Sequence, residues 1–363
     1  MSAHEIIIWI MAAFAVLGAL DRIFGNKFGI GKEFEEGILA MGSLAIAMIG
    51  IITLAPVLAA VLKPVIVPVY RLLGADPAMF AGTILACDMG GGALAQEMTA
   101  DPQAAMLGGV LTGSMLGATI VFTIPVAMGI LKEQDRPAMA KGILCGIVTI
   151  PVGVLVGGLV AGFPIMMVLR NLIPIVLIAA LIALGLWKAE KWMIRGFGAF
   201  GKFIIAVITV GLAAAIVESL TGFAIIPGMA PIEEGFLTVG AIAIVLAGAF
   251  PLVYMLTKLL KKPLMKLGHL LGINDTAAAG LIASLANSIA TFGLVKDMDN
   301  RGKVVNIAFA VSAAFVFGDH LGFTAGFAPE MLPAVIAGKL SGGITAIAVA
   351  LWLTRKDGKE REL

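Results

Sequence analysis

Long, almost uninterrupted apolar blocks are the feature that most restricts how this chain can fold. The first block, "EIIIWIMAAFAVLGAL", lies at the amino terminus, and similar blocks recur along the 363 residues. A bilayer core about 30 Å thick is crossed by roughly 20 apolar residues in a helix, and the blocks approach or exceed that length. A composition of 60% hydrophobic and only 13% charged residues is also unlike that of a soluble domain. The sequence therefore predicts an all-α integral membrane protein, folded as a polytopic helical bundle.

Nine blocks are predicted to be continuous spanning helices. They lie near residues 4–24, 37–62, 104–131, 139–161, 166–187, 197–218, 235–257, 303–326 and 331–354. The first block lacks a basic leading segment and a clear small-residue cleavage site, so we do not expect a cleaved signal peptide. Two further apolar segments, 78–98 and 276–296, are interrupted by polar residues or glycines. We expect these two segments to be broken helices.

An internal repeat relates the two interrupted segments. A shift of 198 residues aligns "EEGILAMGSLAIAMIG" (35–50) with "EEGFLTVGAIAIVLAG" (233–248), with eight identities in sixteen positions. The same offset holds without a gap over about 80 residues, which compositional bias alone does not readily produce. We therefore predict a first repeat over 1–161, a connecting helix over 162–190 and a second repeat over 191–363, together forming a single membrane domain.

Basic clusters orient the two repeats, because Lys and Arg gather in cytoplasmic loops. Three clusters are evident, comprising Lys188, Lys191, Arg195 and Lys202; Lys258, Lys261, Lys262 and Lys266; and Arg355, Lys356, Lys359 and Arg361. All three can be cytoplasmic only if segment 276–296 enters and leaves the membrane on one side. The same reasoning puts the amino terminus outside and makes segment 78–98 enter from outside. The prediction is an inverted repeat with two opposed re-entrant elements, the arrangement that marks a transporter substrate site.

The first interrupted segment, "LACDMGGGALAQEM", supplies the leading candidate residue. Asp88 is a carboxylate in an apolar block, and the glycines at 90–92 weaken a helix by about 1 kcal/mol each relative to alanine. Broken backbone and a charge are tolerated in a membrane only where protein or a water-filled cavity covers them. We predict that Asp88 offers its negative charge to a small cation, with Cys87 and Met89 beside it in the binding site. The alternative is that Asp88 caps a half-helix and the glycines only allow close packing.

Asn287 occupies nearly the equivalent place in the second repeat, one position from the strict offset. An amide can donate a hydrogen bond to a hydroxyl and accept one from it. We therefore predict that Asn287 binds substrate, with Ser288 next to it in the same break of the chain. A buried asparagine can equally bridge two helices, so a structural role stays open.

A third constellation, "FGDHLGF", places Asp319 and His320 side by side within the block predicted to form the helix 303–326. Ionisable residues inside a membrane segment are functional candidates by default, and histidine titrates near neutral pH. Both residues join the predicted substrate site. The alternative is an Asp–His pair at the outer end of the helix, with no part in function.

Other kinds of site find little support in the sequence. The three histidines are widely spaced, no His-Glu-x-x-His pattern occurs, and the two cysteines lie in apolar surroundings, so we expect no metal, no cofactor, no disulfide and no enzymatic chemistry. No basic tract indicates nucleic acid. Membrane lipid is the expected surrounding, and self-association into a homo-oligomer remains open. A purely structural membrane subunit would not need Asp88 in a glycine-broken segment.

Several long strings resemble one known family, the bacterial ethanolamine utilization transporters. The similar stretches are "FEEGILAMGSLAIAM", "MFAGTILACDMGG", "TIVFTIPVAMGI", "GIVTIPVG", "MDNRGKVVNIAFAVSAAF" and "GDHLGF", in order over nearly the whole chain. The resemblance implies a permease that moves ethanolamine across the cytoplasmic (inner) membrane of a bacterium to supply its breakdown. The chemistry agrees with this expectation, because an ammonium ion with one hydroxyl needs one carboxylate and neutral hydrogen-bonding partners. The alternative expectation is a sodium- or proton-coupled transporter or exchanger of another small cation.

Overall fold

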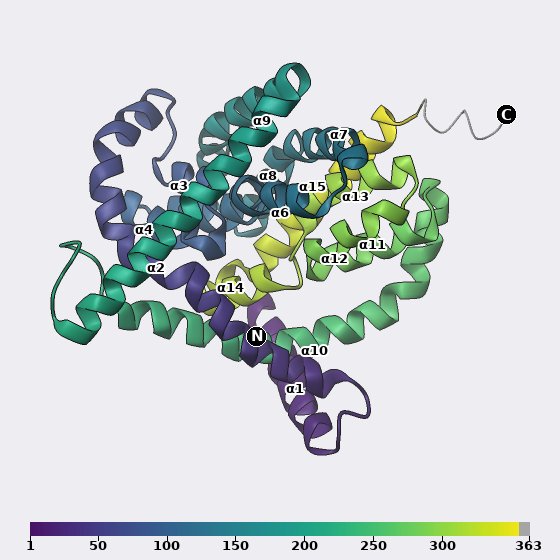
Figure 1. The fold of residues 1–363 in the computed structure, drawn as a ribbon, viewed down its shortest axis with the longest axis horizontal. Helices are drawn as coiled ribbons and strands as arrows, with labels where there is room; N and C mark the ends of the chain where they lie inside the picture. Colours follow the sequence, from purple (N-terminus) through teal and green to yellow (C-terminus); the bar gives the residue numbers. More distant parts are fainter. Residues whose placement is uncertain (356–363) are drawn as a thin grey trace.

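Helices make up nearly all of the computed structural model, which describes residues 1–355 except the side chains at 260, 261, 264, 267 and 269 (Figure 1). The long helices are α1 (Ala3–Ile23), α2 (Ile30–Leu72), α9 (Ile165–Thr221), α10 (Ile232–Leu271) and α15 (Leu332–Leu353). The shorter α-helices are α3 (Ala78–Ile84), α4 (Gly91–Met98), α5 (Pro102–Ala105), α6 (Ile124–Ile130), α7 (Arg136–Ile147), α8 (Ile150–Val160), α11 (Asp275–Ala286), α12 (Ser288–Leu294), α13 (Asn300–Ala313) and α14 (Asp319–Phe327). Wider π-helical turns over Met106–Gly117 and Thr119–Thr123 join α5 to α6.

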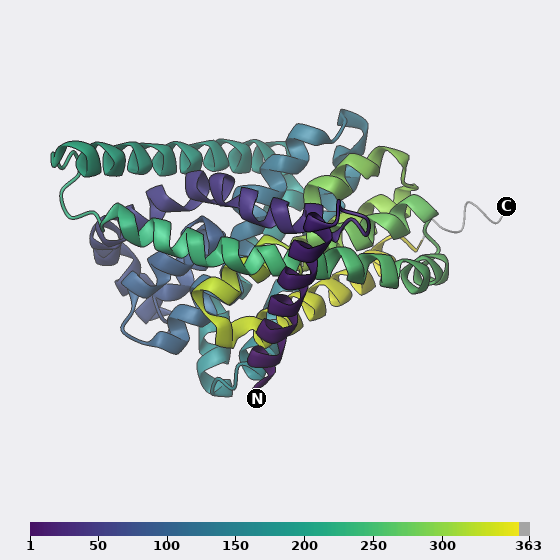
Figure 2. The same ribbon diagram turned by 90° about the horizontal axis from the view of Figure 1, so that it is seen from below.

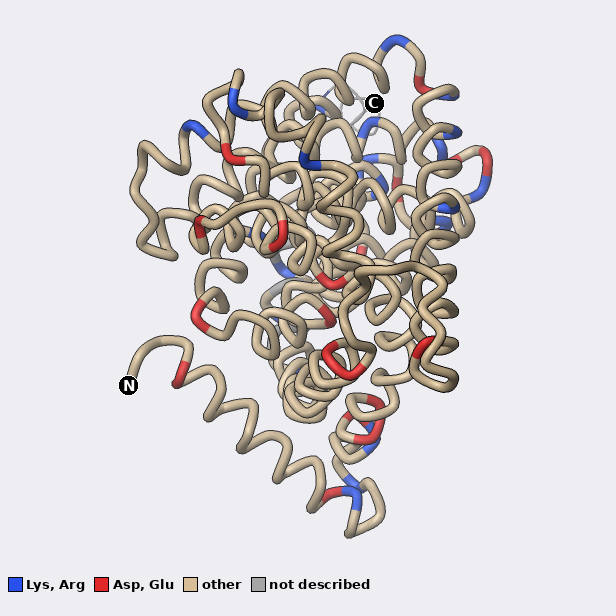
Figure 3. The backbone as a smooth tube through the Cα atoms, turned by 90° about the vertical axis from the view of Figure 1, so that its left-hand side faces the viewer, with Lys and Arg blue, Asp and Glu red and all other residues tan. Residues whose placement is uncertain are grey.

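Seven helical stretches among the described residues are long and apolar enough to cross a membrane. Charged residues are sparse along the chain, and long parts of the backbone contain none (Figure 3). The predicted all-α polytopic membrane fold is therefore confirmed. The expected spans 166–187 and 197–218 both fall within α9, whose backbone leaves helical geometry at Ala189 (φ −140°, ψ 43°). Of the basic residues used to orient the chain, Lys356, Lys359 and Arg361 and the side chain of Lys261 lie outside the described part.

The prediction of one continuous helix over 303–326 is wrong. Helix α13 ends at Ala313, five residues form turns, and α14 begins at Asp319. The backbone N–H groups of Phe315 and Phe317 donate to the carbonyls of Ser284 and Leu285, at 3.1 and 2.9 Å. These carbonyls belong to the last turn of α11, where no N–H group of the same helix is available to donate to them. The break thus pairs two of its own N–H groups with two free carbonyls at the end of α11. Broken backbone in an apolar interior requires such pairing, because no water is there to replace it.

The helices pack as two units that do not coincide with the two sequence repeats. The α2–α10 unit contains α1, α2, α10 and residues 190–221 of α9, which lie against one another across the molecule (Figures 1 and 2). Its backbones touch closely: a Cβ at Gly37 of α2 would lie 2.5 Å from the backbone of Leu246 in α10. The hairpin unit contains α3–α8, α11–α15 and residues 165–188 of α9. There a Cβ at Gly153 of α8 would lie 2.7 Å from the Gly338 carbonyl of α15.

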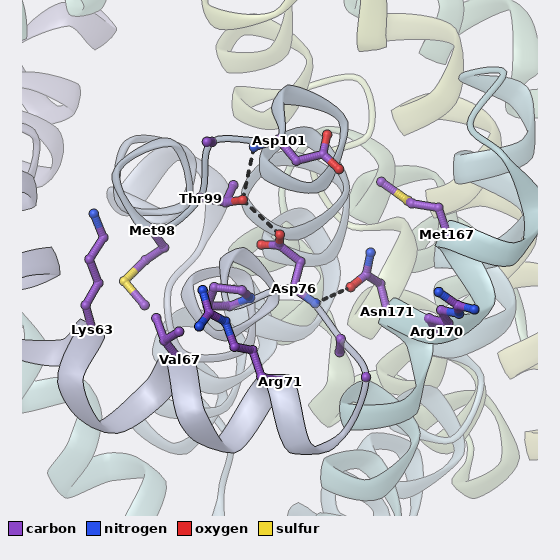
Figure 4. Close-up of a pocket in the computed structure, with 14 residues that line it drawn as sticks. Lys63, Val67, Arg71, Asp76, Met98, Thr99, Asp101, Met167, Arg170 and Asn171 are labelled. Atoms are coloured by element: carbon purple, nitrogen blue, oxygen red, sulfur yellow. Dashed lines mark hydrogen bonds between the residues drawn. The ribbon is translucent and has the colours of Figure 1, made fainter.

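Each interrupted segment folds as a helical hairpin whose two ends are tied together. In the first hairpin, α3–α4, the Asp76 carboxylate before α3 accepts a 2.8 Å hydrogen bond from the Thr99 hydroxyl after α4. Figure 4 shows this bond and the 2.7 Å bond from the Asp76 N–H to Asn171 of α9, in a pocket of about 680 Å³. In the second hairpin, α11–α12, the N–H of Asn274 donates to the Asp299 carboxylate at 2.9 Å.

Candidate functional site

A cavity of about 490 Å³ lies between the α2–α10 unit and the hairpin unit. The α2–α10 unit contributes small and apolar side chains, and the hairpin unit contributes every ionisable group of the wall. The described lining residues are Ser43, Leu44, Ala47, Ala86, Asp88, Met89, Ala118, Val121, Phe122, Pro125, Val126, Ile205, Phe315, Asp319 and His320. Two carboxylates and one imidazole therefore face a cavity that is otherwise almost wholly apolar.

Asp88 reaches this cavity because the first hairpin unwinds at its tip. Helix α3 ends at Ile84, Ala86 is extended, and a short turn over Cys87–Met89 leads into Gly90, whose φ is 90°. That left-handed conformation favours glycine. A Cβ at Gly90 would also meet the Ile51 side chain of α2. The glycine thus lets the hairpin tip approach α2 closely, and it leaves the Asp88 side chain 16% exposed toward the cavity.

Asp319 and His320 enter the same cavity from the start of α14. The preceding break needs Gly318, because a Cβ there would collide with the Ala286 carbonyl at the end of α11. The Nε2 atom of His320 lies 3.7 Å from the Asp88 Oδ1, and the ring of His320 lies 5.2 Å from that of Phe315. The structure therefore brings together three of the residues predicted from sequence, Asp88, Asp319 and His320.

Lys339 is a member of this cluster that the sequence reasoning missed. It lies in α15, is 1% exposed, and donates a 2.5 Å hydrogen bond from Nζ to the carbonyl of Ser114. The same Nζ lies 3.0 Å from the Nδ1 of His320, on the opposite side of the ring from Asp88. The signal was present in the sequence, because Lys339 is an ionisable residue inside an apolar block, the criterion that had picked out Asp319.

Asn287 does not line the cavity of Asp88. It faces a second cavity of about 260 Å³, whose lining also includes Glu33, Tyr254 and Asp319. Asp319 thus borders both cavities. The Asn287 Oδ1 accepts a 2.7 Å hydrogen bond from the N–H of Ile289, which makes Asn287 the N-cap of α12. The local geometry accords with the capping preference of asparagine.

The remaining three predicted residues differ in their access to the cavity. Met89 lines the first cavity, and Cys87 is fully buried behind it. Ser288 is also fully buried, lines neither of the two cavities, and its Oγ has no hydrogen-bond partner among the described residues.

Three side chains at the cavity lie close enough together to resemble a metal site. Ligand atoms of Cys87, Asp88 and His320 lie within 4.8 Å of one another. A metal bound by His320 through Nε2 would be held close to the Lys339 ammonium, which contacts the other ring nitrogen at 3.0 Å. A metal on Nε2 and an ammonium on the Nδ1 side of the same ring repel in an apolar interior. While Lys339 is protonated, the residues present do not fit a metal ion.

The cluster suits an organic cation better. With Asp88 and Asp319 ionised, Lys339 protonated and His320 neutral, two negative charges face one positive charge, which leaves one negative charge in excess. The rings of Phe122 and Phe315 also line the cavity, 5.5 Å apart and nearly perpendicular. Aromatic faces attract ammonium groups, and desolvation strengthens that attraction.

The chain matches the family described as "Ethanolamine utilisation protein, EutH" over residues 3–353. It is 60% identical to the "Probable ethanolamine permease EutH" of Listeria monocytogenes over 362 residues, which cover 100% of this chain and 97% of the relative. It is 53% identical to the "Uncharacterized protein YxeR" of Bacillus subtilis, with 98% and 96% covered. It is 49% identical to the protein of Salmonella typhimurium that carries the same name as the Listeria relative, with 98% and 97% covered.

No solved structure matches the fold. The relatives are bacterial, and the described helices include seven that are able to cross a bilayer, so the chain is a multi-pass protein of the bacterial cytoplasmic membrane. The match over residues 3–353 and the full-length identities lead to one assignment: the chain belongs to the EutH family of ethanolamine utilisation proteins.

Proposed function

We propose that this protein carries ethanolamine across the bacterial cytoplasmic membrane in its ammonium form, without changing it chemically. One observation carries the proposal: the charged wall of an otherwise apolar cavity consists of Asp88 and Asp319 with His320. Relatives that are 60% and 49% identical over nearly their whole length are named probable ethanolamine permeases, which supports the same substrate. Those names do not favour the exchange of another small cation.

Within the site, Asp88 pairs with the substrate ammonium, and the rings of Phe122 and Phe315 cover its apolar side. Asp319 and the imidazole of His320 then form hydrogen bonds with the hydroxyl. A carboxylate pairs strongly with an ammonium ion when both are removed from water, which gives the site its preference for amines. Met89 and the α2 wall exclude bulkier substituents.

Alternating access is the proposed transport cycle. Asp319 borders both cavities, so substrate released by Asp88 can pass Asp319 into the second cavity beside Glu33 and Asn287. The repeats over 1–161 and 191–363, joined by 162–190, supply the two hairpins, inserted from opposite sides of the membrane. The hydrogen bonds that join the ends of each hairpin support re-entry. The distribution of basic residues supports insertion from opposite sides.

The substitution Asp88→Asn tests the function directly. It keeps the size of the side chain and removes its charge, so uptake of labelled ethanolamine at low external concentration should fall at least tenfold. Glu97→Gln is the matched control, since Glu97 is an exposed acid at the end of the same hairpin and should leave uptake unchanged. Membrane content is measured for both variants. Normal uptake by a well-expressed Asp88→Asn protein would remove Asp88 from the site.

A further inference from the structure

Lys339 is a buried cation that the proposed substrate site does not use directly. It contacts the Ser114 carbonyl and His320, and it is absent from the described lining of the cavity. The titratable groups gathered around it are Cys87 and Asp88 at the hairpin tip and His320 on α14, and Asp319 precedes His320 at the start of that helix. A charged lysine in a membrane interior is costly unless it is paired, so its position in a transporter calls for a functional explanation.

His320 connects Lys339 to the cavity through its two ring nitrogens. Nδ1 lies 3.0 Å from the Lys339 Nζ, and Nε2 lies 3.7 Å from the Asp88 Oδ1. In the arrangement with Lys339 protonated, Nδ1 accepts from the ammonium and Nε2–H points toward the carboxylate. Histidine can accept a proton at one nitrogen while it gives one up at the other. A proton can therefore leave Lys339, enter at Nδ1, and be replaced by one that leaves Nε2 for Asp88.

We propose that Lys339, His320 and Asp88 form a proton relay that exchanges one proton for each ethanolammonium ion carried. The inference rests on the proposed function. In the empty carrier the ammonium of Lys339 balances Asp88. Before substrate binds, the proton of Lys339 passes through His320 to the Asp88 carboxylate and on to water in the cavity. Lys339 becomes a neutral amine, His320 stays neutral as its other tautomer, and Asp88 is again a carboxylate that holds the substrate cation.

The net charge moved in one cycle determines which gradient drives the exchange, and this can be measured. One positive charge enters the site as ammonium and one leaves as a proton, so a full cycle moves no net charge. The membrane potential then does not drive uptake, whereas a pH gradient does. At equilibrium a one-to-one exchange concentrates ethanolamine about tenfold for each unit of pH by which the lumen is the more acidic.

The test uses the full-length wild-type protein in liposomes, with initial rates of labelled ethanolamine uptake. Protein-free liposomes subtract diffusion of the neutral amine. An acidic lumen should accelerate uptake several-fold, and a potassium–valinomycin potential should leave the rate unchanged. A pH-sensitive dye in the lumen should report a rise in pH that depends on ethanolamine, and the Lys339 variants below separate proton exit from entry of the neutral amine. Uptake that follows the potential and ignores the pH gradient would overturn the relay. A wild-type protein that takes up no ethanolamine would instead overturn the proposed function.

Two substitutions of Lys339 separate proton transfer from simple charge balance. Lys339→Met removes the cation, and Lys339→Arg keeps a charge that does not deprotonate in proteins. Both should abolish the response to the pH gradient, and Lys339→Met should make uptake follow the potential. Lys141→Met, at an exposed lysine of α7, should behave as wild type. If either Lys339 variant is folded and keeps the pH response, the relay is wrong. If both misfold, His320→Gln replaces them, with the same loss expected.

Discussion

The position of Asn287 allows two roles, capping of α12 and contact with substrate in the second cavity. Its Oδ1 caps α12 through the N–H of Ile289, and its side chain also faces the second cavity together with Asp319. A cap needs only an acceptor oxygen, so serine or aspartate can replace asparagine there. A hydrogen bond that the amide N–H₂ donates to substrate is lost in both replacements, because ionised aspartate has no donor and the serine hydroxyl lies on a shorter side chain. The two roles therefore respond differently to the same substitutions.

We expect the capping role to dominate. Asn287→Ala should lower stability by about 1 kcal/mol, seen as a lower thermal midpoint of the purified protein, because the first turn of α12 loses its acceptor. Asn287→Ser should keep both the midpoint and the rate of ethanolamine uptake. A stable Asn287→Ser protein with a markedly raised KM would show instead that the amide touches the substrate on its route.

The ionisable residues show what the sequence can reveal at this scale. Asp88, Asp319 and His320 were predicted because a charge in an apolar block is costly and needs a reason. Their meeting at one cavity depends on the folded chain, since Asp88 and His320 lie in different repeats. Lys339 satisfied the same criterion and was missed. The cavity faced by Asn287 was not predictable, because the offset gives an equivalent position in the repeat and no information on where the side chain points.

The two hairpins can be placed on opposite sides of the membrane by labelling. Because Asp76 is bonded to Thr99 and Asn274 to Asp299, the two ends of each hairpin lie on the same side. Because Lys and Arg favour the cytoplasm, we expect the first pair outside and the second pair inside. In intact cells, an impermeant maleimide should therefore label Ala100→Cys, whereas Lys296→Cys should need permeabilised membranes.

Controls for this experiment are available within the chain. Ala100 and Lys296 are exposed, while the native Cys87 and Cys145 are buried, so the unmodified protein gives the background. Lys188→Cys, at an exposed residue beside the break of α9 at Ala189, marks the expected cytoplasmic side. Labelling of Ala100→Cys and Lys296→Cys from the same side would refute the inverted arrangement.

Helix breaks differ in how visible they are in the sequence. The glycines at 90–92 and the capping Asn287 mark the hairpin tips, and both segments were predicted to be interrupted. The break at 314–318 has no proline and was predicted as helix. It is fixed by hydrogen bonds from Phe315 and Phe317 to the end of α11, a segment about 30 residues away in the sequence. A break imposed by a tertiary contact leaves little local signal.

The two repeats interlock in the whole molecule. Helix α2 of the first repeat packs against α10 of the second, and α8 of the first packs against α15 of the second. The close backbone approaches at Gly37 and Gly153 both join helices of different repeats. Rocking one sequence repeat against the other as rigid bodies would separate these contacts. The cavity instead lies where the α2–α10 unit meets the hairpin unit.

The expected motion is therefore between these two packing units, and spin labels can distinguish the alternatives. Lys27 lies in the α2–α10 unit, whereas Lys132 and Lys296 lie in the hairpin unit, and all three are exposed. The pair Lys27→Cys with Lys132→Cys lies within one sequence repeat but spans the two units. The pair Lys132→Cys with Lys296→Cys spans the two repeats but lies within one unit.

We expect ethanolamine to shift the distance distribution between labels at 27 and 132 and to leave the distribution between 132 and 296 unchanged. The physical reason is that substrate neutralises the charged wall on the hairpin unit, while the α2 side of the cavity is uncharged, so the contact between units is the one that changes. Asp88→Asn should abolish the shift between the labels at 27 and 132, which links that shift to substrate binding. If the 132–296 distance changes and the 27–132 distance does not, the sequence repeats are the moving bodies and the packing units are not.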